Sequence, residues 1–171
     1  MQRTHYPYER NHVYRYTFIS LGRRRIKKVV EFSLTGIENI YNLAFGGIKI
    51  DGTVDDKASS NNGDIVRTLS TVIHILRDFS LHRPASVIFF TGSTKQRTRL
   101  YARIIKTYYD EFSKDFHITG LALYEKRYAE EIFTRENAYK YSAFLRFAAL
   151  ACRPANLIGL DKNNYSAAFK K

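Results

Sequence analysis

The chain begins with segments in which hydrophobic and polar residues alternate, the pattern of β-strands with one buried face. Residues 13–19 are rich in β-branched and aromatic side chains, and residues 25–32 alternate. The glycine and arginines within residues 21–24 predict a turn, so the two segments should form a β-hairpin. Residues 40–50 predict a third strand, and the first part of the chain is therefore expected to be an antiparallel meander.

The hydrophobic period changes after a polar loop at residues 51–63. Over residues 65–79 the apolar side chains recur every three or four positions, which predicts an amphipathic helix. Asn62 or Asp64 could cap the start of this helix, and residues 82–84 should end it because they include a proline.

Strand and helix patterns alternate in the second half of the chain. Residues 86–91 are too uniformly apolar for a half-exposed strand, so a central strand covered on both faces is expected there. A helix with its inner face between residues 100 and 112 should follow, and residues 116–124 should return as a strand. Residues 138–147 carry apolar side chains at period two and predict a last strand, although their alanine and leucine content also permits a helix.

This order of elements, β-β-β-α-β-α-β with a further strand, predicts an α+β or α/β fold. We expect a single-domain sandwich in which an antiparallel meander leads into a right-handed β-α-β unit, with two helices packed on a mixed sheet. Residues 1–150 should form this domain, and residues 151–171 should form a basic C-terminal tail.

Composition indicates a folded protein with a strongly basic surface. Hydrophobic residues make up 44% and aromatic residues 15% of the 171 positions, which argues against disorder. The formal net charge of +12 favours a polyanionic partner, which could be nucleic acid, an acidic protein or an anionic membrane, and solubility by charge is the alternative. The apolar runs of the chain are too short to cross a membrane, and no signal peptide is visible. Cys152 is the single cysteine and cannot form an internal disulfide. We therefore expect a cytoplasmic protein without a membrane partner.

A candidate anion site lies where the strand at residues 86–91 should give way to a helix. Backbone N–H groups at a helix start, the helix dipole and nearby arginines all favour a bound anion there. The polar residues before the earlier helix could lie at the same sheet edge. Ordinary helix caps and turns are the alternative for both segments. The candidates for anion or ligand binding are Asn61, Asn62, Asp64, Gly92, Ser93, Thr94, Arg97, Arg99 and Tyr101.

Two groups of cations could bind the phosphates of nucleic acid. One lies at the predicted hairpin, in a segment that contains no acidic residue, and comprises Arg23, Arg24, Arg25, Lys27 and Lys28. The other repeats at helical spacing, for which a solvated helix face is the alternative, and comprises Lys95, Arg99, Arg103 and Lys106. Four tyrosines near the hairpin could stack on unpaired bases, with packing in the core and sheet as the alternative. They are Tyr6, Tyr8, Tyr14 and Tyr16.

Catalytic and metal-binding patterns are weak. Asp51, Asp55 and Asp56 cluster in a loop, where an acidic surface loop explains them better than a metal site. The histidines have no ligand spacing, and the chain has no P-loop, zinc pattern or Ser-His-Asp order. We expect no metal and no cofactor, and the sequence leaves open whether the protein is an enzyme.

Segments 41–46, 61–64 and 92–101 (GSTKQRTRLY) resemble a family of small uncharacterised bacterial proteins associated with Bacteroidota-type genomes. The resemblance covers roughly residues 12–147 and implies one compact domain without an established activity. A fainter, architectural resemblance is to coenzyme-A-dependent N-acetyltransferases, through the element order and Leu100-Tyr101. Where those enzymes bind pyrophosphate with a Gln/Arg-x-x-Gly-x-Gly/Ala loop, this chain has SSNNGD, with one glycine and an acid that would repel phosphate.

The cationic charge and the candidate anion site support three functional hypotheses. The first is a protein that binds nucleic acid, RNA in particular, for example as part of a toxin–antitoxin or phage-conflict module. The second is an N-acetyltransferase-like or nucleotide-binding enzyme that uses Ser93, Thr94 and Arg97 together with Asn62. The third is a module that binds an acidic protein partner through its cationic face.

Overall fold

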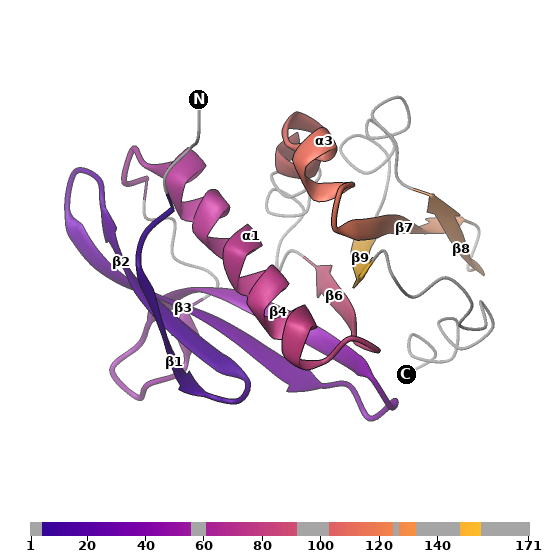
Figure 1. The fold of residues 1–171 in the computed structure, drawn as a ribbon, viewed down its shortest axis with the longest axis horizontal. Helices are drawn as coiled ribbons and strands as arrows, with labels where there is room; N and C mark the ends of the chain where they lie inside the picture. Colours follow the sequence, from indigo (N-terminus) through magenta and orange to yellow (C-terminus); the bar gives the residue numbers. More distant parts are fainter. Residues whose placement is uncertain (1–4, 56–60, 92–102, 125–126, 133–147, 155–171) are drawn as a thin grey trace. The chain divides into compact units, whose positions relative to one another are not determined.

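The computed structural model describes residues 5–55, 61–91, 103–124, 127–132 and 148–154 (Figure 1). The chain divides into two compact units. The first comprises Met1–Ser33 and Leu43–Arg83, and the second comprises Leu34–Asn42 and Pro84–Lys171. Each unit is built on β-sheet.

The sheet of the first unit is an antiparallel meander. Its strands are β1 (Tyr8–His12), β2 (Arg15–Leu21), β3 (Arg25–Leu34), β4 (Ile40–Ile48) and β5 (Val54–Asp55). The hydrogen-bonded order is β1-β2-β3-β4, and β5 pairs with β4. In the β2–β3 hairpin Arg15 lies opposite Glu31 and Leu21 opposite Arg25, so only residues 22–24 form the turn.

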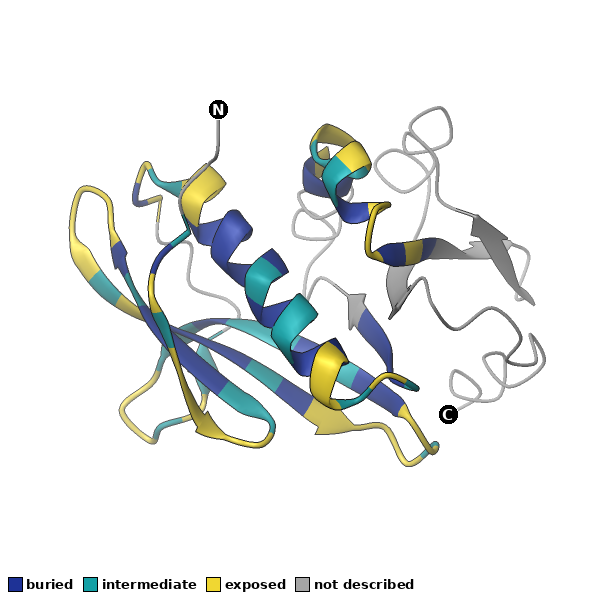
Figure 2. Ribbon diagram, viewed as in Figure 1, coloured by how far each residue is buried: buried dark blue, intermediate teal, exposed yellow. Residues whose placement is uncertain are grey.

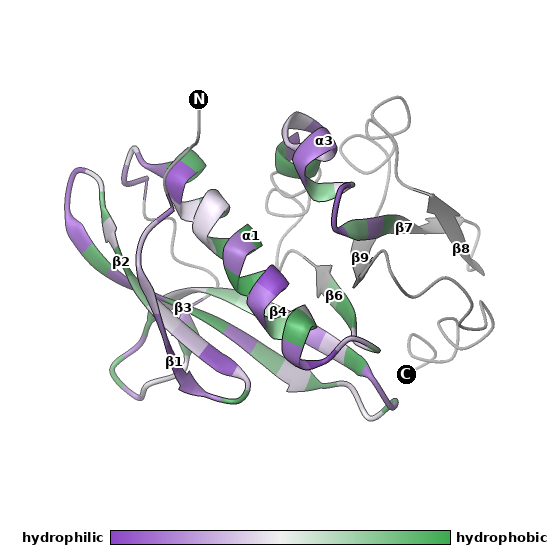
Figure 3. Cartoon of the chain, viewed as in Figure 1, coloured by the Kyte–Doolittle hydropathy of each residue, from purple (hydrophilic) through white to green (hydrophobic). Residues whose placement is uncertain are grey.

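Helix α1 (Ile65–His82) packs against this meander, and its exposed positions lie at its two ends, while its middle turns are buried or half-buried (Figures 2 and 3). Its buried residues run without a break from Thr68 to Ile73, and further along the helix they include Leu76 and Phe79. Phe79 is completely buried and stacks on Phe32 of β3, with ring centroids 3.8 Å apart and planes 8° apart. The burial of this aromatic pair helps to attach the helix to the sheet.

The second unit holds a mixed sheet. Residues 40–42 of β4 pair in parallel with β6 (Val87–Thr91). Strand β9 (Ala148–Pro154) lies between β6 and β7 (Phe116–Tyr124) and is antiparallel to both, while β8 (Arg127–Ile132) pairs with β7. Residues 103–107 are helical and lead into the short helix α3 (Tyr109–Phe112). The parallel pairing of β4 with β6, with α1 between them in the chain, gives the predicted β-α-β order.

The structure confirms the predicted α+β class and the antiparallel meander. The hairpin turn, helix α1 and the strand at residues 116–124 also agree with their predictions. The strand predicted at residues 13–19 has different bounds in the structure. Strand β2 spans Arg15–Leu21, and residues 13–14 separate it from another strand, β1. Strands β5, β8 and β9 were not predicted, and the predicted tail boundary after residue 150 falls inside β9. The strand or helix predicted at residues 138–147 lies outside the described residues.

In the described part of the chain, no helix combines the length and the apolar character needed to cross a lipid bilayer.

Candidate functional site

The turn of the β2–β3 hairpin is fixed by Asn62, which is only 3% exposed. The Asn62 backbone carbonyl accepts a hydrogen bond from the N–H of Arg23 at 2.8 Å. The side-chain carbonyl accepts from the N–H of Arg24 at 2.8 Å. The side-chain amide nitrogen donates to the Arg24 carbonyl at 2.9 Å and to Ser20 Oγ at 2.8 Å. Residues 23 and 24 thus have their backbone held while their side chains stay outside.

Gly22 is needed where the hairpin meets Asn62. A Cβ atom on residue 22 would lie 1.9 Å from the backbone oxygen of Asn62, far inside any allowed separation. Because that neighbour is main chain, no rotamer change could relieve the clash. The hairpin can approach Asn62 this closely only with glycine at the position.

Asp64 occupies the N-cap position of α1, but its carboxylate makes no capping bond to the helix backbone. Its Oδ2 atom accepts hydrogen bonds from Ser20 Oγ at 2.6 Å and from the Tyr6 hydroxyl at 2.8 Å, with Thr68 Oγ1 at 3.3 Å. Partial burial acts to raise the pKa of the Asp64 carboxyl, but these donors outweigh it and hold the pKa below its ordinary value. Asp64 is therefore a charged acceptor that ties the N-terminal segment, β2 and α1 together.

These bonds bear on the predicted anion site at residues 61–64. The side chains of Asn62 and Asp64 are engaged inside the first unit, and Asn61 is exposed with a φ of +31°. A ligand at this segment would meet the Asp64 carboxylate at the helix start, which opposes the attraction of the helix dipole for anions. Their role as ligand-binding residues stays a prediction.

Four of the predicted hairpin cations lie on the surface. Arg23, Arg24, Arg25 and Lys27 are exposed, and none of them forms an ion pair with a described carboxylate. Lys28 differs, because it points to the opposite face of β3 and is 5% exposed, with its Nζ 5.9 Å from the centroid of the Phe45 ring. Burial leaves Lys28 little surface to offer a phosphate group, so the exposed set is the other four.

The remaining predicted residues belong to the second unit or lie outside the described residues. Arg103 and Lys106 are exposed on the helical residues 103–107 of the second unit. The other candidates lie outside the described residues, namely Gly92, Ser93, Thr94, Lys95, Arg97, Arg99 and Tyr101.

Most of the tyrosine surface predicted to stack on bases is used inside the protein. Tyr6 and Tyr16 are 2% and 0% exposed. Tyr14 is half-buried beneath Arg83, whose guanidinium carbon lies 4.7 Å from the ring centroid, and Tyr8 is half-buried against Tyr16. Tyr6 and Tyr16 therefore pack in the core, which was the alternative to base stacking, and their rings have no exposed face for a base.

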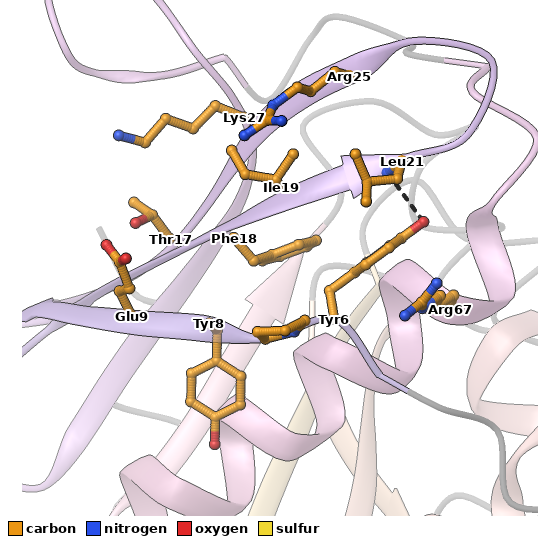
Figure 4. Close-up of a pocket in the computed structure, with 11 residues that line it drawn as sticks. Tyr6, Tyr8, Glu9, Thr17, Phe18, Ile19, Leu21, Arg25, Lys27 and Arg67 are labelled. Carbon is orange, nitrogen blue, oxygen red and sulfur yellow. Dashed lines mark hydrogen bonds between the residues drawn. The ribbon is translucent and has the colours of Figure 1, made fainter.

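A hollow of about 680 Å³ opens where β1 diverges from β2 (Figure 4). The β1–β2 pairing begins at Tyr8 opposite Phe18, and beyond it the Leu21 N–H donates to the Tyr6 hydroxyl at 3.0 Å. The described residues that line the hollow are Tyr6, Pro7, Tyr8, Glu9, Thr17, Phe18, Ile19, Leu21, Arg25, Lys27 and Arg67. Its lining therefore combines an apolar surface with three cations and one carboxylate.

Among the described cations of the lining, Arg67 is the one that the sequence did not predict. Its guanidinium carbon lies 4.2 Å from the centroid of the Tyr6 ring, a cation–π interaction that fixes its position. In the sequence Arg67 is an isolated cation in the first turns of a helix, with no cationic cluster around it to mark it. Only the folding of the N-terminal segment against α1 brings it beside the hollow.

The fold and this surface define a small α+β protein whose meander carries a rigid, exposed basic hairpin. The chain belongs to DUF6934, a family of unknown function whose model matches residues 2–148. This agrees with the resemblance of the sequence to an uncharacterised family. No curated protein and no solved structure matches the chain.

Proposed function

We propose that this protein binds nucleic acid, RNA in particular, or another polyanion through the exposed cations of the β2–β3 hairpin. The observation that carries the proposal is the set of four exposed side chains, Arg23, Arg24, Arg25 and Lys27, without a described carboxylate as partner. Cations without internal partners keep their attraction for phosphate, and their binding releases counterions from the nucleic acid. The net charge of +12 adds a long-range attraction that speeds encounter.

The bonds of Asn62 support the proposal because they fix the backbone from which the cations project. With the backbone of Arg23 and Arg24 held by three hydrogen bonds, binding costs only the ordering of the side chains. Phosphate interactions of this kind set position and affinity without reading sequence. We therefore expect binding that depends strongly on salt and weakly on base sequence.

Filter binding of a labelled RNA at about 50 and 200 mM salt tests the proposal. The double variant Arg23→Gln/Arg24→Gln should weaken binding at low salt. It should also flatten the dependence of log affinity on log salt by about 0.7–0.9 for each phosphate that the variant no longer neutralises. The matched control is Lys49→Gln/Lys114→Gln, which removes the same charge from two exposed lysines that are not part of the hairpin.

The proposal fails if the wild-type protein binds RNA without salt dependence, or if the hairpin variant and the control weaken binding equally. Tight binding to an acidic protein, without binding to RNA or DNA, would instead support the third hypothesis, a module that binds an acidic protein partner.

An N-acetyltransferase-like enzyme is the second candidate, and one observation favours it. The antiparallel meander is followed by a helix and by a strand, β6, that pairs in parallel with β4, which fits the element order on which that resemblance rests. Against it stands the Asp64 carboxylate at the start of α1, where coenzyme A would place its pyrophosphate. A thermal shift assay with coenzyme A decides the matter, because a bound ligand raises the melting temperature and an unbound one does not.

A further inference from the structure

The hollow beside β1 has a composition suited to one class of ligand, and we infer that it binds a nucleotide unit, a base with its phosphate. This inference deepens the proposed function and rests on it, because the hollow shares Arg25 and Lys27 with the basic hairpin. The unit can be a free nucleotide or one residue of a single strand, since both present the same chemistry.

Charge is the first argument. Arg25, Lys27 and Arg67 line the hollow against a single carboxylate, Glu9. None of the three cations forms an ion pair with a described acidic residue, so their charge remains available to an anion. A phosphate group accepts several charge-assisted hydrogen bonds and suits either end of the lining, since Figure 4 shows Arg25 and Lys27 on the β2–β3 hairpin and Arg67 at the other end, beside Tyr6.

Arg67 is also held in place before any ligand arrives. Its guanidinium lies over the Tyr6 ring, and the Tyr6 hydroxyl is itself fixed by bonds to Asp64 and to the Leu21 N–H. No described group accepts a hydrogen bond from the Arg67 guanidinium, so its N–H groups can bind a ligand. A cation fixed in this way loses less entropy when it binds a phosphate.

Shape and apolar surface are the second argument. Ile19 lies opposite Lys27 and Leu21 opposite Arg25 in the β2–β3 register, so apolar and cationic side chains alternate across one face of the hairpin. Leu21 is 56% exposed and lies at the hollow beside Ile19, so the two side chains offer apolar surface to a ligand (Figure 4). A volume of about 680 Å³ lies within the range of small-molecule sites, and it is too small for a duplex. A flat base that packs on the apolar side chains, with its phosphate bound by a cation, matches both the apolar and the cationic part of the lining.

The test compares three probes on the full chain: a labelled oligouridylate of about 10 nucleotides, an RNA duplex of equal length, and ATP. Two variants probe the hollow, Arg67→Gln for the phosphate and Leu21→Ser for the base. Their controls are Lys114→Gln, which loses the same charge elsewhere, and Leu34→Ser, which changes a leucine that is 64% exposed. Because Leu21 is also exposed, its variant should remain folded even if Arg67→Gln loosens the N-terminal segment.

We expect Arg67→Gln to weaken oligouridylate binding about tenfold and Leu21→Ser several-fold, with duplex binding nearly unchanged and both controls like wild type. Binding of ATP that is sensitive to the same variants assigns the hollow to free nucleotides as well. Oligouridylate binding without ATP binding assigns it to the strand.

The inference is overturned if neither variant weakens oligouridylate binding while Arg23→Gln/Arg24→Gln does, in which case the hairpin proposal survives alone. Absence of any wild-type affinity for all three probes would overturn both.

Discussion

At the scale of single residues, Asn62 explains the polar composition of the segment before α1. Its amide donates two hydrogen bonds and accepts one from partners in the β2–β3 hairpin, whereas an ionised aspartate has no donor and a serine has only one. Gly22 completes the arrangement by leaving room for the Asn62 carbonyl. The sequence predicted a capping or ligand-binding role for Asn62. Its bonds to the hairpin could not be predicted, because the sequence does not show which distant strand will lie beside this residue.

Replacing Asn62 by alanine should destabilise the protein substantially. The change removes three side-chain hydrogen bonds, two with the backbone of Arg24 and one to Ser20 Oγ, which keeps its bond to Asp64. At about 0.5–1.5 kcal/mol for each lost bond, the free energy of unfolding should fall by about 1.5–4 kcal/mol. Urea unfolding measures the loss as a lower midpoint. The control is Asn61→Gly, an exposed neighbour whose positive φ suits glycine and whose change should be nearly neutral. Equal midpoints for the two variants would contradict the role given to Asn62.

Asp64 predicts a specific dependence of stability on pH. Its pKa is lower in the folded state than the ordinary value of 3.8, so its contribution is complete above that pH and is lost as the pH falls through the folded pKa. Asp64→Asn should therefore cost about 1.5 kcal/mol near neutral pH. The difference from wild type should shrink below about pH 3.8. Thermal unfolding across this range measures the gap, and a constant gap would contradict the assignment.

At the scale of elements, α1 and the hairpin were predictable because their signals are local. The apolar period of residues 65–79 specifies a buried helix face, and the glycine and arginines at 22–24 specify a turn. Strand β1 was missed because YERNH carries no apolar alternation, as suits an exposed edge strand. Strand β9 was missed because AALACRP has small side chains with little β-propensity, and its place between β6 and β7 depends on pairing across the chain.

The candidate site was predictable only in part, for the same physical reason. The exposure of Arg25 and Lys27 could be predicted from the alternation of residues along one strand. Lys28 was predicted with them, but it lies on the buried face of that strand. The hollow could not be predicted, because it forms where β1, β2 and α1 meet and its key cation, Arg67, is distant from the hairpin in sequence.

The attachment of α1 to the meander should depend on Phe79. Phe79→Ala would remove a fully buried ring and its stacking on Phe32, at a cost of about 3–5 kcal/mol. Circular dichroism during denaturation should show a large fall in the midpoint. Leu81→Ala is the matched control, since Leu81 is 81% exposed on the same helix and its change should be within about 0.5 kcal/mol of neutral. A similar loss of stability for both variants would contradict this account of the core.

At the scale of the whole molecule, the excess of positive charge connects stability to binding. Like charges repel in the folded state, and a polyanion that binds only this state both relieves the repulsion and shifts the equilibrium. Oligouridylate at about 100 times its dissociation constant should stabilise the fold by about 2.7 kcal/mol. A thermal shift assay should show a higher melting temperature that declines as salt is added, and a neutral polymer should give no shift. A shift that is insensitive to salt would contradict an electrostatic origin.

The bonds of Tyr6 have a practical consequence for anyone who shortens the chain. Its N–H donates to Thr71 Oγ1 at 2.9 Å, and its hydroxyl joins Asp64 to the Leu21 N–H, so one side chain outside the regular strands ties α1 to β2. A truncated version starting at Tyr8 would look complete by its secondary structure yet would lack this tie and the platform beneath Arg67. Trimming or tagging at the amino-terminal end should therefore leave residues 5–7 intact.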